Sequence, residues 1–327
     1  SIYGARAAQG VIIITTRTGK QGSMTLTYDG YYGTQNVAKS SIPDMLDTDE
    51  YMEYLDRSQD AGFVHPVFGS PGSLTKPDMI VVSPGFKGGV SAGDPLADPS
   101  NYDISDYGAA YQIMETSEGT NWFEEILQPG VIQNHQLTAS GGNDKSTYTF
   151  SMNYFGQEGI YKNTDYNRYS ARVNTTYTPK DWIRVGENLQ FIYEKSEGET
   201  TLGEASPWGW AYRMVPYIPA YDIGDANGKR GFGGNAVGES GNASSPVADL
   251  SRDGDDYRQN YKIFGNAFLE IKPIDGLTIR TSYGIDYGNF FNKDFTYRTY
   301  ERSENVGITG FGTGYNYRLT WTWTNTA

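Results

Sequence analysis

Length, composition and charge exclude several classes of protein. The chain has 327 residues, a formal net charge of −13, no cysteine and two histidines. This acidic balance leaves no basic surface for nucleic acid or for an anionic membrane. The absence of cysteine excludes disulfides and thiol catalysis, and His65 and His135 stand far apart in sequence. We therefore expect no nucleic-acid partner, no metal and no cofactor.

The aromatic residues point to an all-β protein. The chain has 27 tyrosines against 14 phenylalanines, together with 40 glycines, and only 37% of its residues are hydrophobic. This composition is typical of strands that have one apolar and one polar face. No run reaches the ~18 apolar residues of a membrane helix, but a transmembrane barrel strand needs only ~9 to 11 residues of alternating pattern.

The chain opens with a short apolar segment. Residues 1–8 have a helical pattern, and the β-branched run Val11–Ile14 follows Gly10 and is closed by Thr15 and Thr16. This pattern predicts a strand that is buried on both faces. A buried strand needs neighbours, so we expect it to be the last strand of a domain in a longer protein.

After a glycine-rich turn, the next segments are less uniform. Apolar and polar residues alternate from Met24 to Tyr32, which predicts a strand with one apolar face. A helix is predicted over residues 48–61, capped by Asp47 or Thr48. Residues 63–120 are rich in Gly, Pro, Ser and Asp, and we expect a long ordered loop there rather than a domain.

Regular alternation begins at residue 131 and predicts most of the fold. With the strand at Met24, about eight strands of roughly 9 to 14 residues result, which is longer than the usual ~5 to 6. The seven further strands are predicted over residues 131–140, 147–155, 169–177, 183–193, 261–272, 277–287 and 315–323.

The connections between these strands alternate between short and long. Short turns fall at 141–144, 179–181 and 273–276, and the long loops span 33–130, 195–260 and 288–314. An outer-membrane barrel places tight turns at its periplasmic end and extended loops outside. Aromatic residues at the strand ends, such as Tyr177 beside the turn at 179–181 and Trp321 at the end of the chain, fit an interfacial girdle. A soluble two-sheet protein with exposed tyrosines stays open on these patterns alone.

The opening residues resemble one known family. Residues 1–20 closely resemble the end of the plug domain in the SusC/RagA-like family of TonB-dependent outer-membrane transporters. The residues that carry this motif are Ser1, Tyr3, Gly4, Arg6, Ala7, Ala8, Gly10, Val11, Ile12, Ile13, Thr15 and Thr16. Further segments that resemble the early barrel of that family, in the same order, are 121–125, 133–142, 157–159, 163–172, 245–248 and 276–280.

The resemblance implies a fold and a function. It implies that residues 1–20 are the C-terminal end of a plug and that residues 21–327 are the N-terminal part of a barrel of about 22 strands. The expected fold is thus a partial antiparallel transmembrane barrel with long extracellular loops. The resemblance also implies an outer-membrane location in a Gram-negative bacterium, import of oligosaccharides or peptides, a SusD-like surface lipoprotein as partner, and energy from the TonB complex, whose contact segment is missing from this sequence.

Candidate ligand contacts lie in the long loop at 195–260. Sugar rings present apolar C–H faces that stack on aromatic side chains, and a transporter mouth needs such platforms. Packing of these rings within the loop or against a lid is the alternative. The candidate residues are Trp208, Trp210, Tyr212, Tyr217 and Tyr221.

Four arginines are predicted on the polar, lumen-facing sides of their strands, where acidic plug residues would pair with them. These are Arg172, Arg184, Arg280 and Arg318.

Several other motifs are weak as sites. The acid pairs Glu124–Glu125 and Asp255–Asp256 would point to opposite faces if they lay on strands. Residues 231–236 lack the strand and helix of a phosphate-binding loop. Asp249–Gly254 fits the first half of a calcium loop, but Asn260 stands where the bidentate acid belongs. Three aspartates of the first long loop are expected to be solvated, namely Asp98, Asp103 and Asp106.

Two rival functions stay open beside the transporter. One is a small outer-membrane barrel that serves as an adhesin or anchor, although Val11–Ile14 would then lack a partner sheet. The other is a surface carbohydrate-active β-protein, which would need two carboxylates within roughly 5 to 10 Å of each other in a cleft. We predict no catalytic residue.

Overall fold

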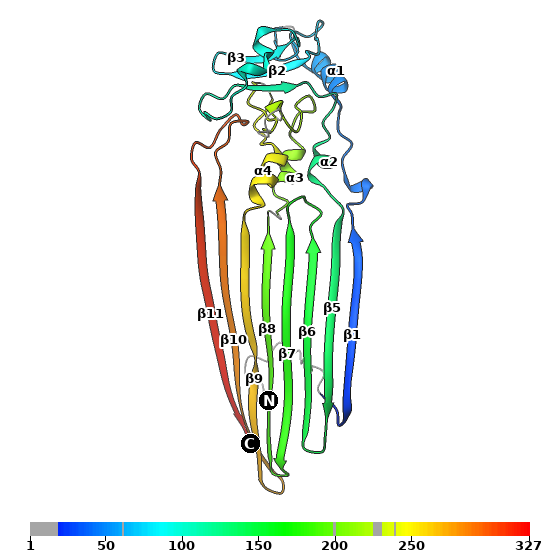
Figure 1. The fold of residues 1–327 in the computed structure, drawn as a ribbon, viewed down its shortest axis with the longest axis vertical. Helices are drawn as coiled ribbons and strands as arrows, with labels where there is room; N and C mark the ends of the chain where they lie inside the picture. The colour runs from blue at the N-terminus through cyan, green and yellow to red at the C-terminus, as the bar shows by residue number, and fades with distance from the viewer. Residues whose placement is uncertain (1–18, 61, 199–200, 225–230, 239) are drawn as a thin grey trace.

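The computed structural model describes residues 19–60, 62–198, 201–224, 231–238 and 240–327. Its main feature is an antiparallel sheet of eight long strands in the order β1-β5-β6-β7-β8-β9-β10-β11 (Figure 1). The prediction of about eight antiparallel strands is confirmed. Their bounds are β1 Gly22–Gln35, β5 Gly130–Gly142, β6 Ser146–Glu158, β7 Asp165–Lys180, β8 Ile183–Glu197, β9 Tyr257–Ile274, β10 Leu277–Thr296 and β11 Gly310–Thr326.

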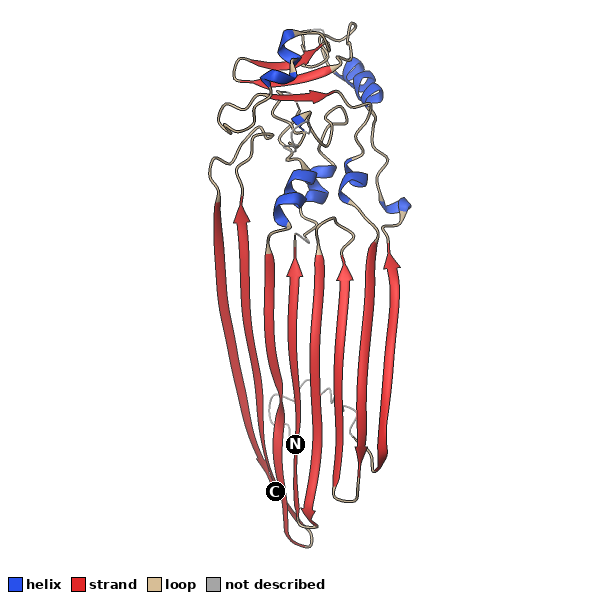
Figure 2. Ribbon diagram, viewed as in Figure 1, coloured by secondary structure: helices blue, strands red, loops and turns tan. Residues whose placement is uncertain are grey.

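The predicted alternation of the connections is also confirmed. Short turns at 143–145, 181–182 and 275–276 lie at one end of the sheet, and all longer connections lie at the other (Figure 2). Gly276 has a φ of 84°, a conformation that glycine adopts without strain. The strands run further into the long connections than predicted. β10, for example, pairs with β11 up to Thr296 opposite Gly310, because the hydrogen-bond ladder continues where the alternation of side chains stops.

The first long connection is more than a loop. It contains a second sheet in the order β3-β2-β4, formed by β2 Met79–Ser83, β3 Phe86–Val90 and β4 Gln112–Glu115. The prediction of a long ordered loop over residues 63–120 missed these three strands. The apolar run at 80–82 is buried on both faces, so it shows no alternation from which a strand could be recognised.

Helices complete the layer of connections above the main sheet (Figure 1). Helix α1 spans Thr48–Ser58, and Asp47 forms a capping box with Glu50, which confirms the predicted start. The other helices are α2 Trp122–Ile126, α3 Pro207–Ala211 and α4 Pro246–Asp253, with single 3-10 turns η2 Lys39–Ser41, η3 Pro95–Ala97 and η4 Pro99–Asn101. We call this assembly, made of residues 36–129, 198–256 and 297–309, the outer layer.

The hydrophobic core of the described chain lies in the outer layer. Trp122, Phe123 and Tyr217 are almost completely buried there, and burial of each such side chain contributes roughly 1.5 to 3 kcal/mol. On the main sheet, by contrast, Met152 is 68% exposed and Trp323 is 66% exposed. The outer layer is therefore stabilised by its own core, whereas the long strands leave large apolar side chains uncovered.

The start of the described chain runs along the sheet near its short turns. A Cβ at Gly19 would lie 2.3 Å from the carbonyl oxygen of Tyr148 on β6, so only glycine fits there. The predicted plug strand and the motif of residues 1–16 lie outside the described residues. No helix among the described residues is long and apolar enough to cross a membrane.

Candidate functional site

The two faces of the main sheet differ sharply in polarity. Residues directly opposite each other on paired strands share a face. One cross-strand row consists of Tyr28, Leu137, Met152, Ala171, Phe191, Ile263, Tyr287 and Leu319. The adjacent row, on the opposite face, consists of Thr27, Thr138, Ser151, Arg172, Gln190, Phe264, Asp286 and Thr320. The sheet therefore has one apolar and one largely polar face.

Aromatic side chains bound the apolar face at both ends. Toward the outer layer, five paired rings cross the sheet, which we call the tyrosine ladder: His135, Tyr154, Tyr169, Tyr193 and Tyr261. Consecutive ring centroids lie 6.3, 5.0, 6.2 and 4.8 Å apart. Near the short turns, Tyr177 is 49% exposed. Trp321, which is 59% exposed, lies midway along the sheet, in the row of Ile285 and Leu189.

The distance between these aromatic rows fits a membrane. Tyr169 and Tyr177 lie on the same face of β7, and eight residues at ~3.3 Å each span about 26 Å along the strand. A strand tilt of ~40° reduces this to about 20 Å along the membrane normal, close to the ~25 Å apolar band of outer-membrane barrels. The apolar face is therefore suited to lipid.

The polar face carries the four predicted arginines. Register places Arg172 and Gln190 on it, and Arg184, Glu270 and Arg280 form one row of the same face. The guanidinium of Arg172 donates to Asn188 Oδ1 at 3.2 Å, and that of Arg318 pairs with Asp286 at 3.1 Å.

Two of these arginines gather around one aromatic ring. The guanidinium carbons of Arg280 and Arg184 lie 4.0 and 5.6 Å from the Phe268 ring centroid, and Arg280 pairs with Glu270 at 3.6 Å. All four arginines thus lie on the face that is turned away from the apolar surface. Whether plug residues pair with them stays a prediction.

The five aromatic candidates do not form a single site. Tyr217 is fully buried, and its ring packs on Phe68, with centroids 4.9 Å apart, while its hydroxyl lies 2.6 Å from Ser240 Oγ. Its ring is thus a core element and is not accessible to a ligand. Trp208 and Tyr212 lie together, with rings 6.1 Å apart, and both pack edge-on against Phe123.

Trp210 and Tyr221 lie elsewhere in the outer layer. Both are half-buried against its core. The Arg213 guanidinium covers the Trp210 ring at 4.3 Å, and Tyr221 packs on Phe232 with ring centroids 5.9 Å apart. The accessible aromatic surface is therefore centred on Tyr212, which is 50% exposed; Trp208 beside it is half-buried against the core.

The segment 121–125 links two long connections. It forms α2, and the Asn121 side chain caps this helix by accepting from the N–H groups of Phe123 and Glu124. Trp122 Nε1 donates to the Val215 carbonyl at 3.0 Å. This contact holds the connection that carries Trp208 and Tyr212 against the first one.

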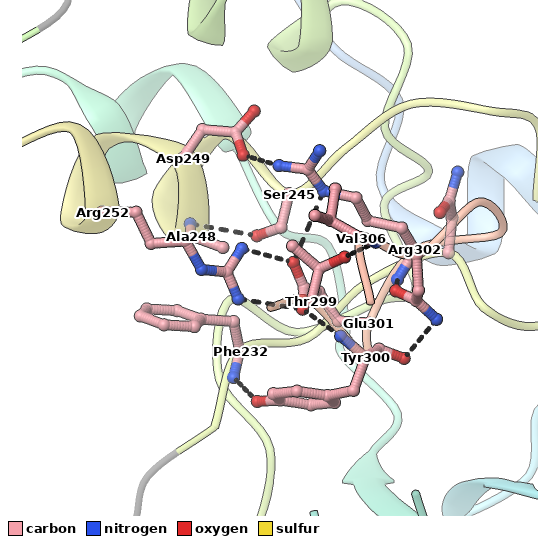
Figure 3. A network of polar contacts seen from close by, with 12 residues as sticks. Phe232, Ser245, Ala248, Asp249, Arg252, Thr299, Tyr300, Glu301, Arg302 and Val306 are labelled. Carbon is pink, nitrogen blue, oxygen red and sulfur yellow. Dashed lines mark hydrogen bonds and ion pairs between the residues drawn. The ribbon is translucent and has the colours of Figure 1, made fainter. Parts of the chain in front are cut away.

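A buried polar network joins two other connections (Figure 3). The Arg252 guanidinium on α4 donates to both oxygens of Glu301, at 2.7 and 3.0 Å, and Arg302 pairs with Asp249. The Tyr300 hydroxyl accepts from the Phe232 N–H at 2.7 Å. The connection between β10 and β11 is thereby fixed to the one between β8 and β9.

Burial and charge act in opposite directions within this network. Burial alone would raise the pKa of Glu301, but the hydrogen bonds and the charge of Arg252 hold it below its ordinary value. Burial raises the pKa of Asp249, and the positive charges of Arg302 and Arg252 offset this only in part. Glu301 therefore stays ionised and serves as the anionic centre of the network. No local sequence pattern points to Glu301, because its partner Arg252 is distant in the chain.

The weak motifs have structural roles. Asp249 to Asp253 belong to helix α4, which excludes the loop geometry of a calcium site. Within residues 231–236, Gly231 donates to the Asp222 carboxylate at 3.0 Å. A Cβ at Gly234 would lie 2.2 Å from the Glu301 carbonyl oxygen. These glycines permit close packing in the outer layer.

The acidic candidates serve local structure as well. Asp98, Asp103 and Asp106 each accept a backbone N–H two residues further on. The Ser100 amide and hydroxyl lower the pKa of Asp98. Asp256 accepts from the Phe295 N–H. Across the described residues, no group of three His, Asp or Glu side chains could hold a metal ion.

Comparisons with known proteins agree with this architecture. No family model matches the chain. It is 27% identical over 295 residues to TonB-dependent receptor P3 of Formosa agariphila, covering 88% of this chain and 23% of that protein. It is 26% identical over 227 residues to TonB-dependent receptor SusC of Bacteroides thetaiotaomicron, covering 69% of this chain and 17% of SusC. The chain thus spans about a quarter or less of these curated relatives.

Solved structures show the same fold. The RagAB peptide importer in its closed-closed state matches 99% of this chain and 34% of its own, with a TM-score of 0.69 and 22% identity. The open-open state of that importer gives the same values.

Together these features define part of the wall of an outer-membrane β-barrel, with its loops gathered at one end. The sequence relatives narrow the class further. The chain is similar in sequence to TonB-dependent receptors, SusC among them, and it shares the fold of a chain of the RagAB importer. These relatives are named as receptors and importers, not as enzymes.

Proposed function

We propose that the chain supplies part of the barrel wall and the outer loops of a nutrient importer. In this proposal residues 1–20 end a plug and residues 21–327 begin the barrel. The observation that carries it is the two-faced sheet, apolar toward lipid and polar on the side that carries Arg172 and Arg318. A polar inner surface lets hydrophilic cargo pass along the wall, whereas the apolar outer surface anchors the wall in the membrane.

The proposed cargo is an oligosaccharide or a peptide. The Trp208 and Tyr212 rings, held edge-on against Phe123, offer a platform that is ordered before cargo arrives. Sugar C–H faces and aromatic peptide side chains both stack on such rings, and each contact contributes ~0.5 to 1.5 kcal/mol. Trp210 and Tyr221 are secondary candidates because the Arg213 guanidinium covers the Trp210 ring and Tyr221 packs on Phe232, whereas Trp208 adjoins the exposed Tyr212.

The proposed partners are a SusD-like surface lipoprotein and the TonB complex. The outer layer supports the first of these, because its own buried core gives a lipoprotein a stable surface to close upon. The TonB complex would supply the energy that moves the plug. Both partnerships require the full-length protein.

Uptake by the full-length protein tests this function. The gene is deleted and restored in its host, and growth is compared on glycans and on peptides as the sole carbon source. Restoration should rescue growth on one of the two, and a tonB deletion should abolish that rescue. Equal growth of the deletion strain and its parent on both cargo classes would refute the importer.

The aromatic platform is tested within the same strain. Replacing Trp208 and Tyr212 together with Ala should raise the half-saturating cargo concentration about 5- to 150-fold, from ~1 to 3 kcal/mol of lost stacking. Tyr54→Ala is the matched control, because Tyr54 is also an exposed aromatic of the outer layer, on α1. The proposed platform is refuted if the double variant and Tyr54→Ala have the same half-saturating cargo concentration.

A further inference from the structure

A recess lies on the polar face of the main sheet, beside the short turn at 143–145. Its volume is about 780 Å³, within the ~300 to 1,000 Å³ range of ligand pockets. Seven of its thirteen lining residues are Ser or Thr, and these come from β1, β5 and β6. The charged residues of the lining are Lys20, Asp29 and Arg172. Lys20 and Asp29 are exposed to solvent, and Arg172 is already bonded to Asn188 Oδ1, so the covered part of the recess offers mainly hydroxyl and amide groups.

One row of the recess continues across six strands as a neutral polar band. Each member has a hydroxyl or an amide group, and such groups can both donate and accept hydrogen bonds. Charged side chains such as Arg172 and Asp286 belong to the next row of the same face. The members of the band, in strand order, are Thr25, Ser140, Thr149, Asn174, Asn188 and Asn266.

Two buried atoms of this band have unused hydrogen-bonding capacity. Thr149 is 8% exposed, and Asn174, directly opposite it on β7, is 7% exposed. Neither Thr149 Oγ1 nor Asn174 Oδ1 has a hydrogen-bond partner among the described residues. Nearly all buried polar atoms in proteins are hydrogen-bonded, so these two exceptions need an explanation. Thr149 lines the recess, and a molecule bound there would lie against its side chain.

The recess lies where the proposed plug joins the wall. Thr149 is three residues from the start of β6 at Ser146, and the short turns of outer-membrane barrels are periplasmic. The backbone at Gly19 crosses β6 at the same level, since a Cβ on Gly19 would lie 2.3 Å from the Tyr148 carbonyl oxygen. Cargo that enters through the outer layer would therefore leave the wall at this end.

We propose that the recess is an exit subsite, which binds a neutral oligosaccharide before its release into the periplasm. The proposal rests on the importer function given above and narrows its cargo. Sugar hydroxyls donate and accept hydrogen bonds, so they match the Ser, Thr and Asn groups of the band. A peptide brings charged termini, and burying a charge against neutral groups is unfavourable. The unpartnered atoms of Thr149 and Asn174 gain a partner when sugar binds, which favours its transfer from water.

Removal of one hydroxyl tests the proposal in the full-length protein. Cells of the host strain are given oligosaccharides of the glycan that supports their growth, labelled by borotritide reduction, which keeps them neutral. Thr149→Val removes the hydroxyl with little change of shape and should lower the maximal uptake rate about 2- to 13-fold. The half-saturating concentration should stay unchanged, because cargo is captured in the outer layer. Thr149→Ser retains a hydroxyl and should keep the wild-type rate.

Thr147→Val is the matched control. Thr147 is a half-buried threonine on the same strand and face, two residues nearer the turn, and it does not line the recess. This variant should transport like the wild type, and heat-modifiable gel migration checks that all variants are folded. Equal maximal rates for Thr149→Val and Thr147→Val would overturn the subsite, as would a change confined to the half-saturating concentration.

The cargo class is decided by growth of the same strain. Import of peptides alone would overturn the neutral ligand. Import of neither cargo would refute the importer and the subsite with it, whereas glycan import with equal rates in the two valine variants would refute the subsite alone.

Discussion

Acidification should loosen the outer layer through one side chain, His65. The imidazole is only 1% exposed and packs on the rings of Phe68 and Tyr217, at centroid distances of 4.9 and 5.6 Å. Its Nδ1 accepts from the N–H groups of Val67 and Phe68 at 3.2 and 3.4 Å. Since Nδ1 is an acceptor, the neutral ring carries its hydrogen on Nε2, and a second proton would break these contacts.

The size of the effect follows from the pKa of His65. Burial lowers it from 6.5 to about 4. Between these two values the unfolded layer binds a proton that the folded layer excludes, so stability rises with pH and is lost on acidification. At ~1.4 kcal/mol per pH unit, going from pH 7 to pH 5 should cost about 2 kcal/mol.

Hydrogen exchange on the full-length protein measures this loss. After correction for the intrinsic exchange rate, amides in segments 63–69 and 216–218 should open about 30-fold more often at pH 5 than at pH 7. His65→Asn keeps an acceptor for the Val67 N–H but does not titrate, so its opening should be nearly independent of pH. The reasoning fails if the wild type and His65→Asn respond to pH in the same way.

Three further predictions address the network, the glycine packing and the two sheet faces. Glu301→Gln leaves a buried guanidinium without its carboxylate and should lower the stability of the outer layer by ~3 to 5 kcal/mol, seen as rapid proteolysis within residues 297–309. Glu53→Gln removes an exposed ion pair and should lower stability by less than ~1 kcal/mol. Equal rates of proteolysis of the two variants would count against the network. Gly234→Ala should detach the same connection, because its Cβ would collide with a backbone oxygen; unchanged exchange at 299–303 would contradict this. Met152→Arg on the apolar face should lower the free energy of unfolding from a bilayer by ~2 to 4 kcal/mol, whereas Ser151→Arg on the polar face should change it little. Similar losses for the two variants would mean that the faces are assigned wrongly.

The strands of the wall could be predicted from the sequence because one face of each strand is turned to lipid and the other to the polar side of the wall. Side chains such as Met152 and Ser151 alternate in polarity because one faces lipid and the other faces the polar side of the wall. That alternation predicted the strands, the faces and the positions of the short turns. The outer layer has no such constraint. Ile80 and Val81 are buried on opposite sides of a five-residue strand, in two separate clusters, and the local sequence pattern does not distinguish such a short run from a loop.

The candidate site could be predicted only in part, for a related reason. Composition identifies an aromatic loop, but burial depends on partners far away in sequence. Tyr217 was predicted as a ligand contact and belongs to the core because Phe68 and Tyr51 enclose it. The His65 and Glu301 contacts likewise join segments separated by long stretches of chain, and the sequence alone does not pair them.

The outer layer has its own buried core, whereas the long strands leave their apolar side chains uncovered, and this difference bears on how such a protein could work. One contact between the two parts is the hydrogen bond from the Phe295 N–H on β10 to the Asp256 carboxylate in the outer layer, at 2.6 Å. The wall is stabilised by the membrane and the layer by its own buried residues, so the layer can be loosened without releasing the strands. A loosened layer would no longer hold Trp208 and Tyr212 in fixed positions, and positioned groups bind more tightly than mobile ones. Damage to the outer core should therefore reduce cargo capture while the barrel remains inserted in the membrane.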